Sequence, residues 1–464
     1  MRFENRDNFR PLSVFSIAYK LLWLFEQEHA LGRRITWLND RTLVFRINDK
    51  QRLPISNCRS KGPRYYRGFM RIDLPHYPDV TNPDSDDRIY SSDSPDIIAH
   101  ETAHAIIDSI APALYHSSYA QSKAIHEGIA DFCAFVLATT MTKLRRRLLE
   151  KAGYELRNAA DLVQIARQYG QQRLSDQKSF LRSLSNEAKL SEVDGTKPHK
   201  LSAVLSGLLL DVICDEYKAK IRDPETQRTR GKSPEFIASE ALRVTIWIVR
   251  RMVFRALDYL PPGDIGFTCF VEAMLASDMR AYPKKSQARV REYLTVRAEN
   301  RGVFNRTQFN IEPKKGTKRT IFEGVKLANL VKDNEALSEF ILKNSGQLGI
   351  PSNAKVLKTR AYKSKKKYWR GQKNTLGRHE IIPELIIKVS WVDGSTPLDK
   401  TGNLDRKLYR LHGVTLVVDW KLKSTQFRLT SNSNPGKLTQ VEKTLGLVCD
   451  SIFDEKLSET EVFY

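Results

Sequence analysis

A run of five residues has the types and spacing of a metal site: His100-Glu101-Thr102-Ala103-His104, or HExxH. In a helix, residues i and i+4 lie one turn apart on the same face, so both imidazoles can reach one ion. The glutamate between them points to the side, where it can act as a general base toward a water molecule. The motif therefore predicts a zinc centre with His100 and His104 as ligands and Glu101 as base.

This centre needs a third ligand, because a catalytic zinc takes three protein ligands and leaves its fourth position to water. The downstream sequence HEGIAD, residues 126–131, offers Glu127 and Asp131, again four residues apart. Glu127 can bind the metal, and Asp131 can accept the outer N–H of a ligating histidine, which fixes its tautomer. His126 is more typical of a solvent-facing residue or a hydrogen-bond partner than of a ligand.

The two motifs together, HETAH followed by HEGIAD, resemble the gluzincin zinc metallopeptidases, of which thermolysin is the type. The resemblance implies a polypeptide substrate that is cleaved at a peptide bond, and a Zn²⁺ cofactor. It implies His100, His104 and Glu127 as ligands, Glu101 as base and Asp131 as the partner of His100.

Three further positions match the gluzincin pattern. Asp108 falls four residues after the second histidine, where thermolysin-like sequences also have aspartate. Tyr115 falls eleven residues after it, where the family has a tyrosine that donates to the tetrahedral intermediate. The family's second oxyanion donor is a histidine on a later helix, and His199 is the candidate here. The resemblance thus implies Tyr115 and His199 as catalytic donors, and Asp108 as a supporting residue.

The elements around the motifs are predicted to be mainly helical. Ser94 suits the N-cap of the HExxH helix and Pro95 its first position, and the helix should run to about Ile110. Apolar residues at helical spacing predict the next helices. These lie at about 121–147, 157–169, 200–220, 233–259, 266–278 and 285–300.

Three regions are expected, in an α+β arrangement. Residues 1–93 suit an N-terminal α/β lobe with edge strands, and residues 94–305 the zinc-binding helical region. Residues 306–464 suit a smaller, basic, β-rich C-terminal domain. Its strands are predicted at about 384–392, 407–420 and 424–430.

A basic run, Lys355–Arg378, has no acidic residue, and the chain as a whole has a net charge of +22. Basic residues interleaved with aromatic ones can follow a phosphate backbone and stack on bases. A charge run of this kind is more often a solvated linker or loop. The residues expected to contact nucleic acid or another polyanion are Lys363, Lys365, Lys366, Lys367, Tyr368, Trp369 and Arg370. The alternative function is therefore a regulatory or polyanion-sensing protein with a narrow-specificity or inactive gluzincin module.

The compartment is expected to be the cytoplasm. The five cysteines are odd in number and widely spaced, without a CxxC pair, which favours reduced thiols. The N-terminal residues MRFENRDNFR are charged and unlike a secretory signal. No uncharged apolar window reaches the roughly 18 residues that a membrane span needs.

Overall fold

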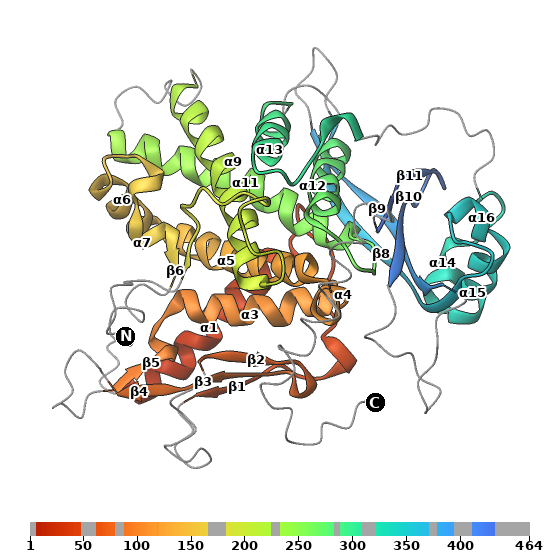
Figure 1. The fold of residues 1–464 in the computed structure, drawn as a ribbon, viewed down its shortest axis with the longest axis horizontal. Coiled ribbons are helices and arrows are strands. Elements are labelled where there is room, and N and C mark those ends of the chain that lie inside the picture. The colour runs from red at the N-terminus through yellow and green to blue at the C-terminus, as the bar shows by residue number, and fades with distance from the viewer. Residues whose placement is uncertain are drawn as a thin grey trace.

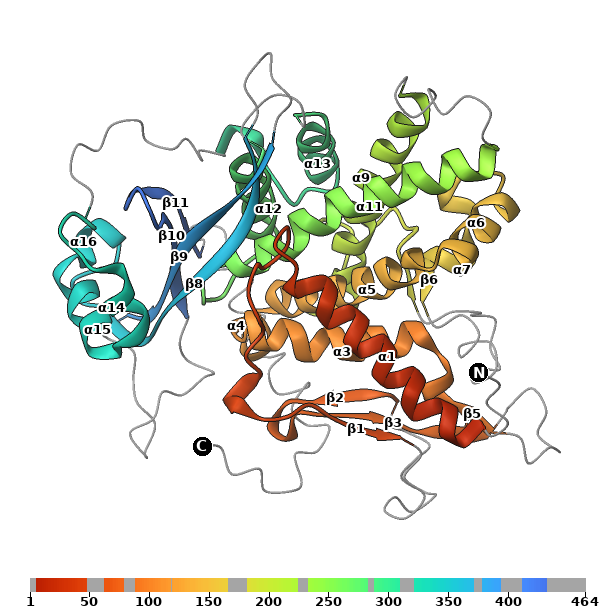
Figure 2. The same cartoon turned by 180° about the vertical axis from the view of Figure 1, so that it is seen from behind.

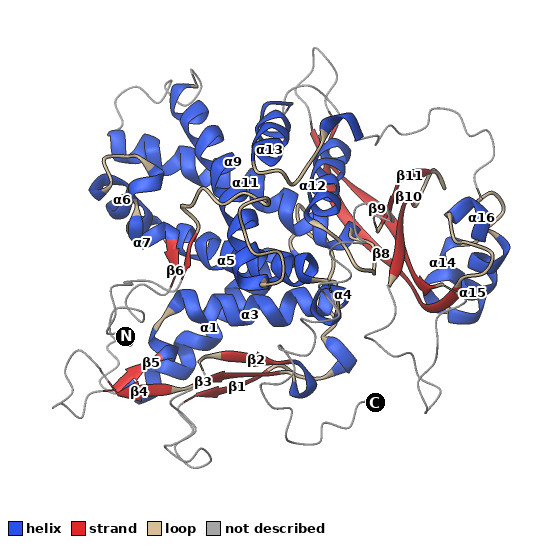
Figure 3. Cartoon of the chain, viewed as in Figure 1, coloured by secondary structure: helices blue, strands red, loops and turns tan. Residues whose placement is uncertain are grey.

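The structure is a computed structural model, and its α+β class confirms the prediction: helices predominate, and the strands form separate small sheets (Figure 1, Figure 3). The structure describes residues 6–47, 62–78, 88–117, 119–165, 182–223, 233–282, 288–308, 321–370, 378–393 and 411–431.

Four long helices form the centre of the molecule. They are α3 (Pro95–Ile110), α5 (Ala120–Thr140), α9 (Pro198–Arg222) and α11 (Pro234–Tyr259). One side of α5 packs against α3, and the other side packs against α9. The α5–α9 approach is close, because a Cβ added at Gly128 would lie 3.1 Å from the Leu205 side chain. Their buried side chains belong to one large hydrophobic core that surrounds the HExxH helix.

The start of α3 agrees with the sequence, but its cap differs. Pro95 is the first helical residue and Ser94 the N-cap. The Ser94 hydroxyl does not bond a backbone N–H; it donates to the Asp96 carboxylate, which accepts from the backbone N–H of Ile97 at 3.0 Å. The cap is therefore supplied by the carboxylate in the first turn.

Two helix predictions after α5 are wrong. The helix expected at 121–147 is broken: α5 ends at Thr140, and α6 (Thr142–Lys151) follows at an angle of 98°. The buried Arg145 side chain of α6 donates to the Thr139 carbonyl, so the break is stabilised by a contact between the two helices. Of the helix expected at 157–169, Ala160–Val163 form α7, which runs into β6 (Gln164–Ile165), and residues 166–169 lie outside the described ranges.

Alongside α3, the N-terminal segment builds a small sheet. Figure 1 shows α3 between α5 and this sheet, and Figure 2 shows α1 (Arg6–Glu26) lying alongside α3. In the strand order β1-β3-β2, the strand β2 is at an edge and contacts α3. The strands are β1 (Val44–Ile47), β2 (Arg64–Tyr66) and β3 (Arg71–Leu74), with a separate pair β4 (His76–Pro78) and β5 (Arg88–Tyr90).

After α12 (Phe267–Ala281) and α13 (Ala288–Asn300), the chain forms a four-stranded antiparallel sheet in the order β11-β10-β9-β8. Its strands are β8 (Lys355–Arg370), β9 (Arg378–Val392), β10 (His412–Asp419) and β11 (Thr425–Thr430), so the three predicted strands are present. One face is covered by α14 (Leu327–Lys332), α15 (Asn334–Lys343) and α16 (Ser345–Leu348), as Figure 2 shows.

The opposite face of this sheet shares the core that surrounds α3 and α5. Alternate residues of β9 divide between the two sides: Leu385 and Ile387 pack against α14–α16, whereas Ile386 joins the large core. The sheet therefore belongs to two hydrophobic clusters, and one of them extends to the HExxH helix.

The linker interpretation of the basic run is wrong over 355–370, because these residues form β8. Lys366 and Tyr368 also cannot meet a polyanion as expected, since both face the interior and are almost fully buried. Lys366 Nζ lies 2.7 Å from Asp258, and the Tyr368 hydroxyl donates to Glu384.

The other residues of the polyanion prediction are placed differently. Lys363 and Lys365 are exposed on the outer face of β8, and Lys367 is half-buried. The side chains of Trp369 and Arg370, and residues 371–377, lie outside the part of the chain that the structure describes.

Within the described ranges, no single helix is long and apolar enough to span a membrane; α5 and α6 together meet the length and composition test but are bent by 98°. Cys133, Cys214 and Cys269 are buried free thiols. Cys58 and Cys449 lie outside the described residues.

Candidate metal centre

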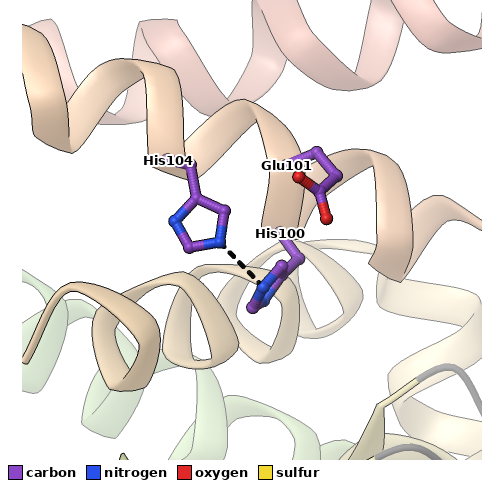
Figure 4. A group of neighbouring side chains, drawn as sticks. All are labelled: His100, Glu101 and His104. Carbon is purple, nitrogen blue, oxygen red and sulfur yellow. Dashed lines mark hydrogen bonds between the residues drawn. The ribbon is translucent and has the colours of Figure 1, made fainter. Parts of the chain in front are cut away.

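Three side chains of α3 gather their ligand atoms in one place. The ligand atoms of His100, Glu101 and His104 all lie within 4.8 Å of one another, and all three residues are buried. Figure 4 shows both imidazole rings projecting from the same side of the helix, as the HExxH spacing predicts, with the Glu101 carboxylate beside them. This buried group is able to hold a metal ion.

The facing helix α5 adds a second carboxylate to the group. His100 Nε2 and His104 Nε2 lie 3.0 Å apart, and Glu127 oxygens lie 3.6 and 3.7 Å from them. Tetrahedral zinc with bonds of 2.0–2.2 Å would separate its ligand atoms by about 3.3–3.6 Å. The separations among the two histidines and Glu127 are therefore close to those that a single tetrahedrally bound metal ion imposes.

Each imidazole also has a partner for its outer nitrogen. His100 Nδ1 lies 3.0 Å from an Asp131 oxygen, so the carboxylate favours a proton on Nδ1 and a lone pair on Nε2. His104 Nδ1 lies 2.9 Å from His126 Nδ1, and the two rings are stacked. Burial lowers the pKa of His126 to about 4, so its imidazole is neutral. With His104 donating to His126, both Nε2 lone pairs face one another, an arrangement that a bound cation stabilises.

The Glu101 carboxylate is held by the edge strand β2. The backbone N–H of Tyr65 donates to Glu101 Oε2 at 2.8 Å. The same strand is fixed to α3 through Asp108, which accepts from the Tyr65 hydroxyl at 3.0 Å and lies 3.1 Å from Arg67 Nε. Burial raises the pKa of Asp108 to about 6, against the attraction of Arg67. Asp108 thus acts on the site through β2.

The two expected oxyanion donors lie beside the group. Tyr115, on α4 (Ala113–His116), has its ring centroid 5.7 Å from that of His126, and its ring also faces the Arg67 guanidinium. His199 is the second residue of α9. Its Nδ1 lies 3.5 Å from a Glu127 oxygen, and its side chain is 71% exposed. The structure therefore places Tyr115 against His126, and His199 at the solvent side of Glu127.

Sequence reasoning missed the contributions of Tyr65 and Arg67. They lie 36 residues or more before the groups that they hold, and neither belongs to a motif. The available signal was Asp108, which lies one helical turn beyond His104 on a buried face and must therefore find donors. His126 carried a weaker signal, because its position beside Glu127 does not show which way its ring points.

Replacing Asp131 with Asn should lower zinc affinity by about 10- to 100-fold, because the amide no longer fixes the His100 tautomer as a carboxylate does. Competition against a chromophoric chelator would measure this. Asp108→Asn is the matched control: it removes a buried carboxylate from the same helix pair, but one that contacts β2, and should leave zinc affinity unchanged. Equal losses in the two variants would contradict the role of Asp131.

The site therefore contains a buried group able to hold a metal ion, a third donor on the facing helix and a carboxylate anchored beside them. Its description rests on the residues and their geometry in this chain. No model of a known protein family matches the chain, and no curated protein matches its sequence.

Proposed function

We propose that this protein is a zinc-dependent peptidase. The observation that carries the proposal is the convergence of three donors, His100, His104 and Glu127, at separations suited to one ion, with a further carboxylate beside them. Two imidazoles and a carboxylate are a donor set that zinc favours at catalytic sites. The peptide bond as substrate is supported by the resemblance of HETAH and HEGIAD to gluzincins.

A zinc ion held there supplies Lewis acidity, which brings the pKa of a water molecule to about 7. Glu101 is placed to take the proton, since its carboxylate is buried beside the two imidazoles and oriented by the Tyr65 N–H. The same carboxylate can then deliver the proton to the leaving amine. A structural metal site has no use for such a base, so the buried Glu101 supports catalysis over a purely structural role.

Charge that develops on the scissile carbonyl needs hydrogen-bond donors. Tyr115, which packs against His126, and His199, which lies beside Glu127, are the candidate donors. Removing one donor of this kind typically costs on the order of 100-fold in rate. In this proposal His199 approaches from the open side, where a substrate would enter.

The proposal is tested by incubating the zinc-loaded chain with a mixture of peptides and identifying the products by mass spectrometry. Cleavage should stop after treatment with a strong chelator and return when Zn²⁺ is added in equimolar amount. The matched control is the His104→Ala chain, treated in the same way, which should cleave under neither condition. Peptides left intact by the zinc-loaded chain, or cleaved equally after chelation, would refute the proposal.

The polyanion-sensing alternative receives less support, because β8 buries Lys366 and Tyr368 from the basic run. It predicts binding of nucleic acid with strong salt dependence.

A further inference from the structure

Arg250, on α11, is a buried cation without a carboxylate partner among the residues that the structure describes. Its side chain is 7% exposed, its Nη2 lies 2.8 Å from His29 Nε2, and its Nε is buried without a hydrogen-bond partner. The next residue, Arg251, is 1% exposed and is paired with Asp278. A buried charge without a counter-ion typically costs several kcal/mol, so an anion at Arg250 would be stabilising.

The residues around Arg250 add positive charge. In Figure 2 the turn after α1, which carries His29, lies against α11 and β8. Arg255 donates to the carbonyls of His29 and Lys367, and the Lys367 N–H donates to the Glu28 carbonyl. Burial lowers the pKa of His29 to about 3, and the charges of Arg250 and Arg255 act in the same direction. The imidazole is therefore neutral and accepts from Arg250 without balancing its charge.

Aromatic rings border this positive cluster. The Trp247 ring centroid lies 5.6 Å from that of His29. The Tyr282 ring centroid lies 6.5 Å from that of His379, which is exposed. Trp247 is half-buried, so the cluster reaches the surface beside it. The Arg251 guanidinium lies over both rings, 5.1 Å from the Trp247 centroid and 3.9 Å from the Tyr282 centroid, so these rings pack against the cation next to Arg250 in the chain.

We propose that Arg250, His29 and Lys367 form a binding site for a phosphate-bearing anion at the junction of α11 with β8. The guanidinium supplies parallel N–H donors to phosphate oxygens, Lys367 supplies a second positive charge, and His29 holds the guanidinium in place. The residues belong to α11, β8 and the turn after α1, whereas the metal group belongs to α3 and α5. The site is therefore independent of the proposed peptidase activity.

Thermal unfolding of the whole chain in phosphate and in chloride, at equal ionic strength and pH, tests the proposal. Phosphate should raise the midpoint saturably, by about 2 °C or more, because it binds only the folded chain. Arg250→Gln should lose this response. In chloride, the variant should be as stable as the parent or more stable, because it no longer buries an uncompensated charge. A merely structural arginine would instead make the variant less stable in both salts.

Two controls make the result specific. Arg243→Gln changes an exposed arginine of the same helix, paired with Glu240, and should keep the full phosphate response. The titration is repeated on protein from which a chelator has removed the metal, so that phosphate bound to a metal ion does not contribute. Should Arg250→Gln not fold, Lys367→Gln, at a half-buried position, should weaken phosphate binding by roughly tenfold.

The titration is carried out with inorganic phosphate and, separately, with a nucleoside triphosphate. The comparison distinguishes a free phosphate ligand from a nucleotide ligand. A lower half-saturating concentration of the nucleotide would show that the aromatic border contributes, and equal concentrations would identify the phosphate group alone. The proposal is overturned if chloride reproduces the phosphate effect, or if Arg250→Gln and Lys367→Gln respond as the parent chain does.

Discussion

Replacing Glu101 with Gln should reduce peptide cleavage by about 10³- to 10⁴-fold while leaving one zinc ion bound. Glutamine has the same shape, and its amide oxygen can still accept the Tyr65 N–H that holds Glu101 at 2.8 Å. It cannot take a proton from water, so only the proton-transfer step is lost. The rate of cleavage and the zinc content of the same preparation are the two quantities to measure.

Both Glu101 and Glu127 lie beside the histidines, so Glu101 could act either as the general base or as a metal ligand. This variant separates the two roles. A variant that cleaves as fast as the parent would show that Glu101 is not the base. A variant that has lost its zinc would show that Glu101 is a ligand. Glu272→Gln, at a half-buried position on α12, is the matched control and should change neither quantity.

The largest expected effect on stability comes from Asp258, near the end of α11. Its carboxylate is fully buried and lies 2.7 Å from both Arg33 and Lys366, and the Tyr362 hydroxyl donates to it at 2.9 Å. Asp258→Asn leaves the Arg33 guanidinium buried without its counter-ion and leaves Lys366 with Glu384 alone, at 3.8 Å. Such a change typically costs roughly 3–5 kcal/mol in the free energy of unfolding, which urea unfolding would measure.

The pH dependence of this loss has a definite sign. Burial alone would raise the pKa of Asp258, but attraction by Arg33, Lys366 and Lys388 outweighs it and holds the pKa well below its ordinary value of 3.8. A carboxyl with a lowered pKa contributes stability above its unfolded pKa and loses it as pH falls through the folded value. The stability that the ionised Asp258 carboxylate contributes should therefore be present above about pH 5 and be lost at more acid pH.

Asp215→Asn provides the comparison. Asp215 is also paired with an arginine, Arg297, but both side chains are partly exposed, so this change should cost at most about 1 kcal/mol. If Asp258→Asn cost no more than Asp215→Asn, the buried charges would not be what joins α11 to β8 and the turn after α1.

The parts of the structure that the sequence predicts well are those set by local spacing. HExxH places His100 and His104 on one side of a helix whatever surrounds it, and Pro95 begins that helix at the expected residue. Glu127 and Asp131 share a face of α5 for the same reason, and the structure places both within 4 Å of His100. These contacts depend on only two helices lying side by side.

The basic run shows why other parts could not be predicted. Lys366 has charged neighbours in the sequence, which is typical of a solvated segment, yet its partners Asp258 and Glu384 are 108 and 18 residues away along the chain. The period of two that marks a strand is hidden, because the buried face of β8 carries polar side chains such as Ser364 and Lys366. Only the three-dimensional partner shows that such a lysine can be buried.

The strand that holds the base was beyond prediction for a similar reason. The Tyr65 N–H donates to Glu101, which lies 36 residues later in the chain. Because every residue except proline has a backbone N–H, the residue type does not reveal such a donor. Asp108, which fixes that strand, was recognised as a supporting residue but without its partners Tyr65 and Arg67.

The most direct test of the central claim is the zinc content of the purified chain, measured beside His104→Ala and Glu127→Ala. If two helices hold one ion between them, the parent chain contains one zinc per molecule, and both variants lose it. Parent protein that binds no zinc, or a Glu127→Ala chain that retains it as tightly as the parent, would contradict the assignment of these side chains as its ligands.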